Sequence, residues 1–378
     1  MSMLREDVDG ATKRTITRTA NILGALRLDG PLLIGLGAIA LYGQLILYSS
    51  SGGDLGSVVR GSIRLAIGGV LMLALAQLRP GSLRRMTPWL YGVGLLLLIA
   101  VDAIGYTGKG AQRWLDLGFM RFQPSELMKI AVPMACALLL RERSLPPDGK
   151  TLLQLAVIIL VPTALTVVQP DLGTGLLILF SGTLVVLLGG LSWRIIAALA
   201  FTGVGAALVG WNFLHDYQRQ RVLTFLDPQA DPLGSGYHII QSTIALGSGG
   251  LFGKGYLRGT QGQLEFLPER TTDFVLAVIG EELGLVGILV LLGLYLFVVL
   301  RVLFLASQMR DTFARLLSGS LGVIFFVYVF INAGMVSGLL PVVGVPLPLV
   351  SYGGTSMVTL LAGFGMLMSL YANRKLAA

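Results

Sequence analysis

The sequence predicts an all-α, polytopic integral membrane protein with about ten transmembrane helices. Of its 378 residues, 54% are hydrophobic and only 13% are charged, and the mean hydropathy is +0.79, which excludes a water-soluble enzyme. The 50 glycines follow no collagen-like period, a pattern typical of membrane helices that approach one another closely. A spanning helix needs about 20 mostly apolar residues, so roughly ten spans and their loops account for the whole length.

Ten apolar runs mark the expected spans. In chain order they are Pro31–Tyr48, Val58–Leu78, Pro88–Ile104, Leu127–Leu140, Leu152–Val168, Leu172–Leu191, Ile195–Leu214, Phe274–Leu300, Leu316–Met335 and Ser356–Tyr371. The fourth is the shortest, so it must recruit neighbouring residues to cross a bilayer. We expect residues 1–30 to form a cytoplasmic N-terminal tail and residues 31–378 a single transmembrane domain. A large extracytoplasmic loop, 215–272, lies between the seventh and eighth helices.

The basic residues predict that both termini are cytoplasmic. Most of the 28 Lys and Arg residues fall on the same side as the N-terminal tail, as the positive-inside rule requires. The net charge of +8 therefore reflects anchoring beside anionic membrane lipids and does not indicate nucleic-acid binding. The minority of cations on the outer side, where we expect function, are Arg60, Arg64, Lys109, Arg113, Arg121, Lys129, Arg219, Arg221, Lys254, Arg258 and Arg270.

The first candidate site is the outer segment 109–129, in which aromatic, cationic and polar residues alternate directly before a span. We expect an interfacial amphipathic stretch. Trp114 would lie at the level of the lipid headgroups, while Lys109, Arg113 and Arg121 would offer charge to an anionic headgroup. These three cations oppose the bias that sets the topology, so the fold must compensate them.

The fourth span carries a pair of charges close to its start. Pro124 fits the first helical turn, and Glu126 and Lys129 lie three residues apart on one helix face inside the apolar zone. Two interpretations stay open. The pair is either a buried ion pair that locks the helix or part of a cavity or substrate path, because charges at membrane depth are costly.

The loop 215–272 is too long for a simple connector, and loops of this kind tend to carry sites. It closes at Asp273, just before a span that contains Glu281 and Glu282. Asp273 is either an N-cap or a functional acid. The two glutamates are expected to have a role, because buried acids in a membrane span rarely lack one. His215 and His238 lack partners at metal-ligand spacing, so we expect structural or surface roles for them.

The run Asn332–Ser356 is apolar, yet three prolines and five glycines oppose a regular helix there. Such a segment persists at membrane depth only if it is buried in protein or lines a cavity, as a re-entrant loop does. Its last residues, Ser351–Ser356, would offer backbone N–H groups at the start of the final helix to an anionic group.

Three blocks of sequence carry a family resemblance. They are Arg113–Trp114 with Gln123–Lys129, the stretch Phe266–Phe274, and Asn332 through Pro341 to Ser351–Ser356. On these blocks, nearly the whole chain resembles the SEDS family of bacterial cell-wall proteins, RodA and FtsW. The Pro-Glu-Arg form at 268–270 resembles RodA, the elongation branch, more than FtsW, the division branch.

The resemblance implies a SEDS-type transmembrane domain in the bacterial cytoplasmic (inner) membrane. It also implies a peptidoglycan glycosyltransferase that polymerises lipid II into glycan strands on the outer face during cell elongation. The implied partners are a class B penicillin-binding protein, which crosslinks the strands, lipid II, the nascent glycan strand and membrane lipids. Asp273 corresponds to the family's essential loop aspartate, and Glu126 and Lys129 to its polar pair. Thr271 stands where many members have histidine, so that histidine is not a required acid or base here.

This chemistry assigns roles to the candidate residues. A base must take the proton from the acceptor hydroxyl, which suits the carboxylate of Asp273, and positive charge must hold the departing polyprenyl pyrophosphate. A divalent cation, Mg²⁺ or Mn²⁺, can share that task, although no motif fixes its ligands. The candidate substrate-binding residues are Lys109, Arg113, Trp114, Arg121, Glu126, Lys129, Arg219, Arg221 and Ser351.

Two other classes of function stay open. Ten helices, buried charges and a broken segment also suit a transporter that flips lipid II, although the polar groups gather toward one face. The third alternative is a non-catalytic scaffold for the crosslinking enzyme, in which Asp273 would be only a helix cap.

Overall fold

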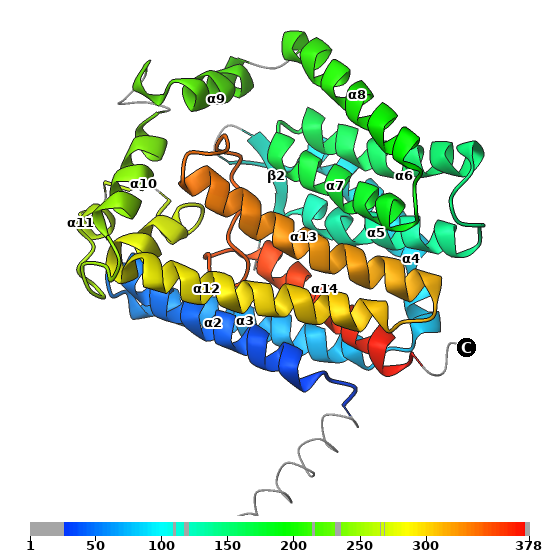
Figure 1. Ribbon diagram of the computed structural model, residues 1–378, viewed down its shortest axis with the longest axis horizontal. Coiled ribbons are helices and arrows are strands. Elements are labelled where there is room, and N and C mark those ends of the chain that lie inside the picture. Colours follow the sequence, from blue (N-terminus) through cyan, green and yellow to red (C-terminus); the bar gives the residue numbers. More distant parts are fainter. Residues whose placement is uncertain are drawn as a thin grey trace, which may run out of the picture.

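The computed structural model describes residues 26–108, 111–116, 121–213, 216–230, 236–264, 266–267 and 269–374. A helix occupies each of the ten predicted spans. Nine of them pack together, and α8 lies at their edge (Figure 1). They are α2 (Gly30–Ser50), α3 (Leu55–Ala76), α4 (Pro80–Ile104), α5 (Pro124–Arg141), α6 (Gly149–Val168), α7 (Leu172–Leu188), α8 (Trp193–Gly210), α12 (Val275–Ser307), α13 (Thr312–Val336) and α14 (Thr355–Ala372). The predicted tail lies almost entirely outside the described residues.

Eight of these helices are long and apolar enough to cross a membrane. The two others are α7, which has 17 residues, and α5, which carries Glu126, Lys129 and Arg141 within 18 residues. The chain is therefore a multi-pass membrane protein, with eight rather than ten helices that meet the length and hydropathy a span requires. The predicted orientation of the termini stays a prediction.

The interior position of α5 explains why it tolerates charge. It packs against α4, α6, α7, α13 and α14, and its Met128, Ala131 and Cys136 are fully buried. Its neighbours are therefore protein rather than lipid along most of its length. As predicted, the helix extends beyond the apolar run at both ends, and Pro124 lies in its first turn.

Glycines set the closest helix contacts. A Cβ atom at Gly68 of α3 would lie 2.6 Å from Leu361 Cδ1 of α14, and one at Gly365 of α14 would lie 2.3 Å from the carbonyl oxygen of Met72. Small residues at such crossings let membrane helices gain dispersion contacts that lipid cannot replace. The high glycine content therefore has the role that the sequence predicts for it.

The predicted loop 215–272 is more ordered than a connector. It contains α9 (Asp216–Leu226), a short 3-10 turn (Pro228–Ala230), α10 (Tyr237–Ser248) and α11 (Thr260–Gln263). The helix α10 packs on α12, and Ser242 Oγ donates a hydrogen bond to the carbonyl oxygen of Val336 at 3.0 Å. Part of this loop thus belongs to the packed body of the protein, whereas α8 and α9 lie at its edge (Figure 1).

The segment expected to be an amphipathic stretch forms a small antiparallel sheet. Its strands are β1 (Tyr106–Gly108), β2 (Ala111–Asp116) and β3 (Arg121–Phe122), in the order β1-β2-β3. Strand pairing satisfies backbone N–H and C=O groups next to the bilayer, where an unpaired extended chain would be costly. Apart from this sheet, the regular elements of the described residues are all helices, as the all-α prediction requires.

The predicted non-helical run is shorter than expected. The helix α13 continues through Asn332 to Val336. The irregular segment, 337–354, follows, and its second residue, Gly338, has φ 73°. Side chains satisfy its carbonyl groups: Asn332 Nδ2 donates to Val345 at 2.8 Å, and the Tyr295 hydroxyl donates to Pro348 at 2.6 Å. Val345, Leu347 and Leu349 are among its buried residues. The part from Val345 to Ser351 is therefore mostly buried in protein, as predicted for an apolar chain that cannot be helical, whereas Leu339 is exposed.

Candidate active site

Asp273 lies in the turn that leads into α12. The N-cap of that helix is Phe274, which makes no side-chain capping bond, so Asp273 stands one residue before the cap position. Its backbone carbonyl accepts a hydrogen bond from Asn332 Nδ2 at 2.9 Å. A Cβ atom at Gly344, where φ is +72°, would lie 3.5 Å from Asp273 Oδ2. The half-buried carboxylate therefore lies against the irregular segment 337–354.

Two hydrogen bonds hold this segment to the turn of Asp273. The Ser351 hydroxyl donates to the carbonyl oxygen of Thr272, and the backbone N–H of Tyr352 donates to the carbonyl oxygen of Thr271 at 2.8 Å. Ser351 Oγ also accepts a hydrogen bond from the Leu347 backbone N–H at 2.8 Å. The one proton of this predicted substrate-binding hydroxyl is thus already used to position the backbone next to Asp273.

Glu126 and Lys129 form an ion pair in the interior. Lys129 Nζ donates to Glu126 Oε1 at 2.6 Å, and both side chains are 7% exposed. Thr359 of α14 donates to Glu126 Oε2 at 3.3 Å, and Lys129 Nζ lies 5.0 Å from the Tyr328 ring centroid of α13. The ion pair that the sequence allowed is present, and its contacts join α5 to α13 and α14.

The ion pair also lines a cavity. Its volume is about 30 Å³, with walls that include Glu126, Lys129, Ile324, Tyr328 and Thr359. Since one water needs at least about 10–15 Å³ of this kind of space, the cavity is large enough for a few waters and too small for a sugar. The structure thus favours a locking role for the pair, while a role in a substrate path stays a prediction.

Arg113 and Trp114 lie on β2. Arg113 donates to the carbonyl oxygen of Pro170, and its Nη1 lies 3.9 Å from Asp171 Oδ1 in the turn between α6 and α7. Gln123 Nε2 donates to the same carboxylate at 2.9 Å. Asp171 thus compensates one of the three cations that oppose the topology. Trp114 is half-buried and pairs with Tyr106 of β1.

No described contact places the other predicted cations next to Asp273. Arg219 donates to the carbonyl oxygens of Trp211 at 3.1 Å and Asn212 at 2.9 Å, which ties α9 to the end of α8. Lys109 lies outside the described residues, as do the side chains of Arg121 and Arg221.

Glu281 and Glu282, which the sequence singled out as unexplained acids, are fully buried and anchor the loop 249–262. Glu281 accepts from Lys254 Nζ at 2.7 Å, from Thr260 Oγ1 and the Gln261 N–H at 2.9 Å, and from the Gly262 N–H at 3.2 Å. Glu282 accepts from Ser49 Oγ at 2.7 Å. A kink of α12 at Gly284, where φ is +66°, lets the loop 249–262 pack against this helix. Their purpose is thus structural.

Two features near Asp273 were not assigned to a site from the sequence. The His238 ring stacks on Phe274, with centroids 5.7 Å apart, which agrees with a structural role; His215 lies outside the described residues. On α3, Arg60 Nε donates to the Tyr352 hydroxyl at 3.3 Å, and the Arg64 guanidinium lies 4.2 Å from the Tyr352 ring centroid. The sequence identifies both arginines as outer cations, but their neighbour, Tyr352, is distant along the chain.

The described residues include no group of three or more His, Cys, Asp or Glu side chains that could hold a metal ion. A divalent cation, Mg²⁺ or Mn²⁺, that shares in holding the diphosphate stays a prediction, and no step below is assigned to a metal.

Comparison of the sequence with known proteins gives matches along almost the whole chain. A family model for cell cycle proteins, named after FtsW, RodA and SpoVE, matches residues 29–376. The chain is 53% identical over 352 residues to the peptidoglycan glycosyltransferase MrdB of Escherichia coli, with 93% of this chain and 95% of the relative covered. It is 33% identical over 431 residues to the peptidoglycan glycosyltransferase RodA of Treponema pallidum, with 93% and 99% covered.

Solved structures share the fold. A chain from work on the structural coordination of polymerization and crosslinking by a peptidoglycan synthase complex matches with a TM-score of 0.80 at 35% identity, with 92% of this chain and 98% of that chain covered. The rod shape determining protein RodA of Thermus thermophilus matches with a TM-score of 0.70 at 32% identity, with 92% and 97% covered.

Proposed function

The chain belongs to the FtsW, RodA and SpoVE family, and from that premise we propose that it polymerises lipid II with Asp273 as the general base. It is a peptidoglycan glycosyltransferase, like its MrdB and RodA relatives. The lipid-linked substrate, the residue roles and the face of the membrane on which it acts belong to this proposal.

The placement of Asp273 carries the proposal. Asp273 as a residue is partly exposed, and its backbone is fixed on both sides, by Asn332 at its own carbonyl and by Ser351 at the carbonyl of Thr272. A base that is held in place but still accessible can accept a proton from a sugar hydroxyl in the transition state. As that hydroxyl oxygen bonds to the anomeric carbon of the donor sugar, the bond from this carbon to the diphosphate breaks, and the electron pair leaves with the diphosphate.

Positive charge must stabilise the diphosphate as it leaves. Among the predicted cations, Lys129 is paired with Glu126, and Arg113 is held by Pro170 and Asp171. Both support the architecture around the site, and a direct contact with diphosphate would require them to exchange these partners. Lys109, Arg121, Arg219 and Arg221 stay candidates from the sequence.

We also propose a class B penicillin-binding protein as partner and the bacterial inner membrane as location. The solved complex that this chain resembles coordinates polymerization with crosslinking, and a polymerase that releases uncrosslinked strands needs a transpeptidase close by. If the N-terminal tail is cytoplasmic, the turn of Asp273 faces the outer side of the membrane, where both enzymes would meet the growing strand.

One experiment tests the polymerase against the flippase and the scaffold. Purified protein, with and without its partner, is given labelled lipid II in detergent, where no compartments exist to flip between. We expect glycan ladders that disappear with Asp273→Ala and Asp273→Asn, while Asp102→Asn, at an exposed acid of α4, keeps them. Ladders that persist in folded Asp273 variants would remove the catalytic assignment. Lipid movement in vesicles without ladders in detergent would favour the flippase.

A further inference from the structure

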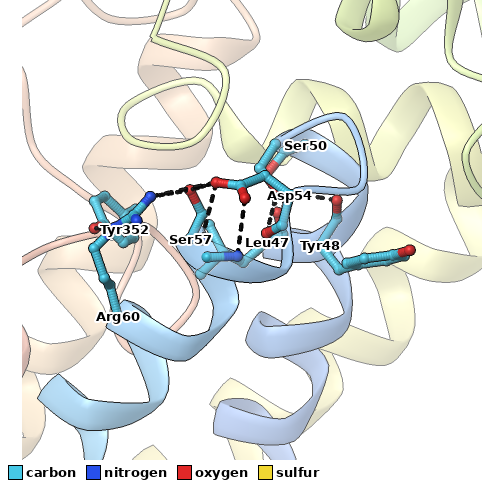
Figure 2. A network of polar contacts seen from close by, with 9 residues as sticks. Leu47, Tyr48, Ser50, Asp54, Ser57, Arg60 and Tyr352 are labelled. Carbon is cyan, nitrogen blue, oxygen red and sulfur yellow. Dashed lines mark hydrogen bonds and ion pairs between the residues drawn. The ribbon is translucent and has the colours of Figure 1, made fainter.

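Two arginines of α3 share one tyrosine of the irregular segment. Arg60 Nε donates to the Tyr352 hydroxyl at 3.3 Å, and the guanidinium of Arg64 lies over the Tyr352 ring, 4.2 Å from its centroid. Figure 2 shows Arg60 beside Tyr352, with Asp54 and Ser57 above the start of α3. Residues four apart lie on one face of a helix, so the two guanidinium groups repel each other unless negative charge comes between them.

The described residues supply only one carboxylate to this pair. Arg60 Nη2 lies 3.3 Å from Asp54 Oδ2 and donates to Ser57 Oγ at 2.9 Å, as Figure 2 shows. Asp54 also caps α3 through the N–H groups of Gly56 and Ser57. The hydroxyl of Ser57 and the N–H of Gly56 hold the pKa of Asp54 below its usual value, so it is an anion at neutral pH. Arg64 forms no ion pair with any described carboxylate, which leaves one positive charge in excess.

The pair lies where a lipid can reach it. Val59, Ile63 and Ile67 on the same helix are more than half exposed, as expected for a helix in contact with lipid. Arg64 lies within the apolar span Val58–Leu78 that the sequence predicts, where an arginine without a carboxylate partner is costly and usually functional. Side chains of a helix tilt toward its N-terminus, so both arginines extend toward the Asp54 end.

The same tyrosine connects this pair to the proposed active site. The backbone N–H of Tyr352 donates to the carbonyl oxygen of Thr271 at 2.8 Å, and its neighbour Ser351 donates to Thr272. A group held by the arginines would therefore lie beside the turn that carries Asp273, on the side that opens to lipid.

We propose that Arg60, Arg64 and Tyr352 form a binding site for the phosphate groups of a lipid that enters from the bilayer alongside α3. Two planar guanidinium groups present paired N–H donors that match phosphate oxygens, and the tyrosine ring fixes one of them by stacking. The lipid is either the diphosphate-linked substrate or an anionic phospholipid. The claim that this lipid is the substrate rests on the proposed function, whereas the claim that the site binds phosphate groups does not.

Binding of farnesyl diphosphate to the purified full chain, in a zwitterionic detergent without anionic lipid, tests the site independently of turnover. We expect Arg64→Gln to weaken binding about tenfold or more, since a charge-assisted hydrogen bond contributes that much, and Arg64→Lys to retain part of it. Arg85→Gln removes the same charge from an exposed position near the start of α4 and should leave binding unchanged. The melting temperature of each variant shows that it is folded.

A second arm separates the two lipid sources. The same variants are titrated with phosphatidylglycerol in nanodiscs of otherwise zwitterionic lipid. Loss of diphosphate binding with unchanged phosphatidylglycerol binding identifies the substrate as occupant, and the reverse identifies a phospholipid; both support a phosphate site. The proposed phosphate site would be overturned if folded Arg60→Gln and Arg64→Gln proteins bound both lipids as well as the unmodified protein does. Asp273→Asn should abolish glycan ladders yet bind farnesyl diphosphate normally. A failure of the catalytic assignment would therefore be distinguishable from a failure of the phosphate site.

Discussion

The hydroxyl of Ser351 donates a hydrogen bond to the carbonyl oxygen of Thr272, which ties the irregular segment 337–354 to the residue that precedes Asp273. Ser351 is 2% exposed, so water cannot easily replace this bond. The position of the proposed base is thus set by a residue far along the chain, and the first prediction tests that dependence.

Ser351→Ala should lower the rate of glycan polymerisation by positioning Asp273 less well. The substitution leaves the Thr272 carbonyl and the Leu347 N–H without this partner, a cost of about 1–3 kcal/mol for buried groups. Polymerisation rate and melting temperature are measured together, with Ser337→Ala as the control. Ser337 is exposed and bonds within its own helix, so its removal should change stability by less than about 0.5 kcal/mol. Equal losses of activity in the two variants would contradict the prediction.

Gly344→Ala should reduce both stability and activity. At φ +72° an alanine is strained by about 1–2 kcal/mol. Its Cβ would make an ordinary van der Waals contact with Asp273 Oδ2, at 3.5 Å, so a backbone shift that relieves the strain would occur next to the proposed base. Gly37→Ala is the matched control, because nothing lies within 4 Å of a Cβ there, and in a helix the change should be neutral or stabilising by up to about 1 kcal/mol. Thermal unfolding and ladder formation report on both variants. A fully active, stable Gly344→Ala protein would show that this contact does not matter.

The Glu126–Lys129 pair can be tested by a double-mutant cycle. Lys129→Met or Glu126→Gln alone should destabilise the protein by about 3–5 kcal/mol, because each leaves a buried group without its partner, whereas the double variant should recover most of the loss. Melting temperatures and ladder assays are compared across the cycle. Recovery of both stability and activity would confirm a locking role. Recovery of stability alone would show that the charges take part in the reaction or in substrate binding.

Glu281→Gln should loosen the loop 249–262 without unfolding the bundle. The buried carboxylate accepts four hydrogen bonds from this loop, and bonds to a charged group contribute about 1.5–3 kcal/mol each. Hydrogen exchange at Gln261 and Gly262 should accelerate, while Glu142→Gln, at an exposed glutamate after α5, should have no effect. Unchanged exchange in Glu281→Gln would mean that the loop is held by other contacts.

Local composition was enough to predict the helical, membrane-embedded class and the position of all ten helices. Hydrophobic length is a property of neighbouring residues, so it can be read without knowledge of the fold. The same holds for the apolar segment after α13, because proline and glycine act on their own backbone. Even there the boundary was wrong, since α13 continues through Asn332 to Val336, where packing outweighs local preference.

The partners of the charged residues could not be predicted in this way. The sequence predicts that Glu281 and Glu282 are buried acids with a role, but not that Glu281 holds the loop 249–262. Likewise, Arg60 and Arg64 form a pair only through their contacts with Tyr352. Such contacts join residues that are distant in the chain, and their energy depends on distance and on exclusion of water, neither of which a linear pattern contains. The hydropathy of individual residues determines that the chain lies in a membrane. The chemistry at Asp273 depends instead on which segments the folded chain brings together.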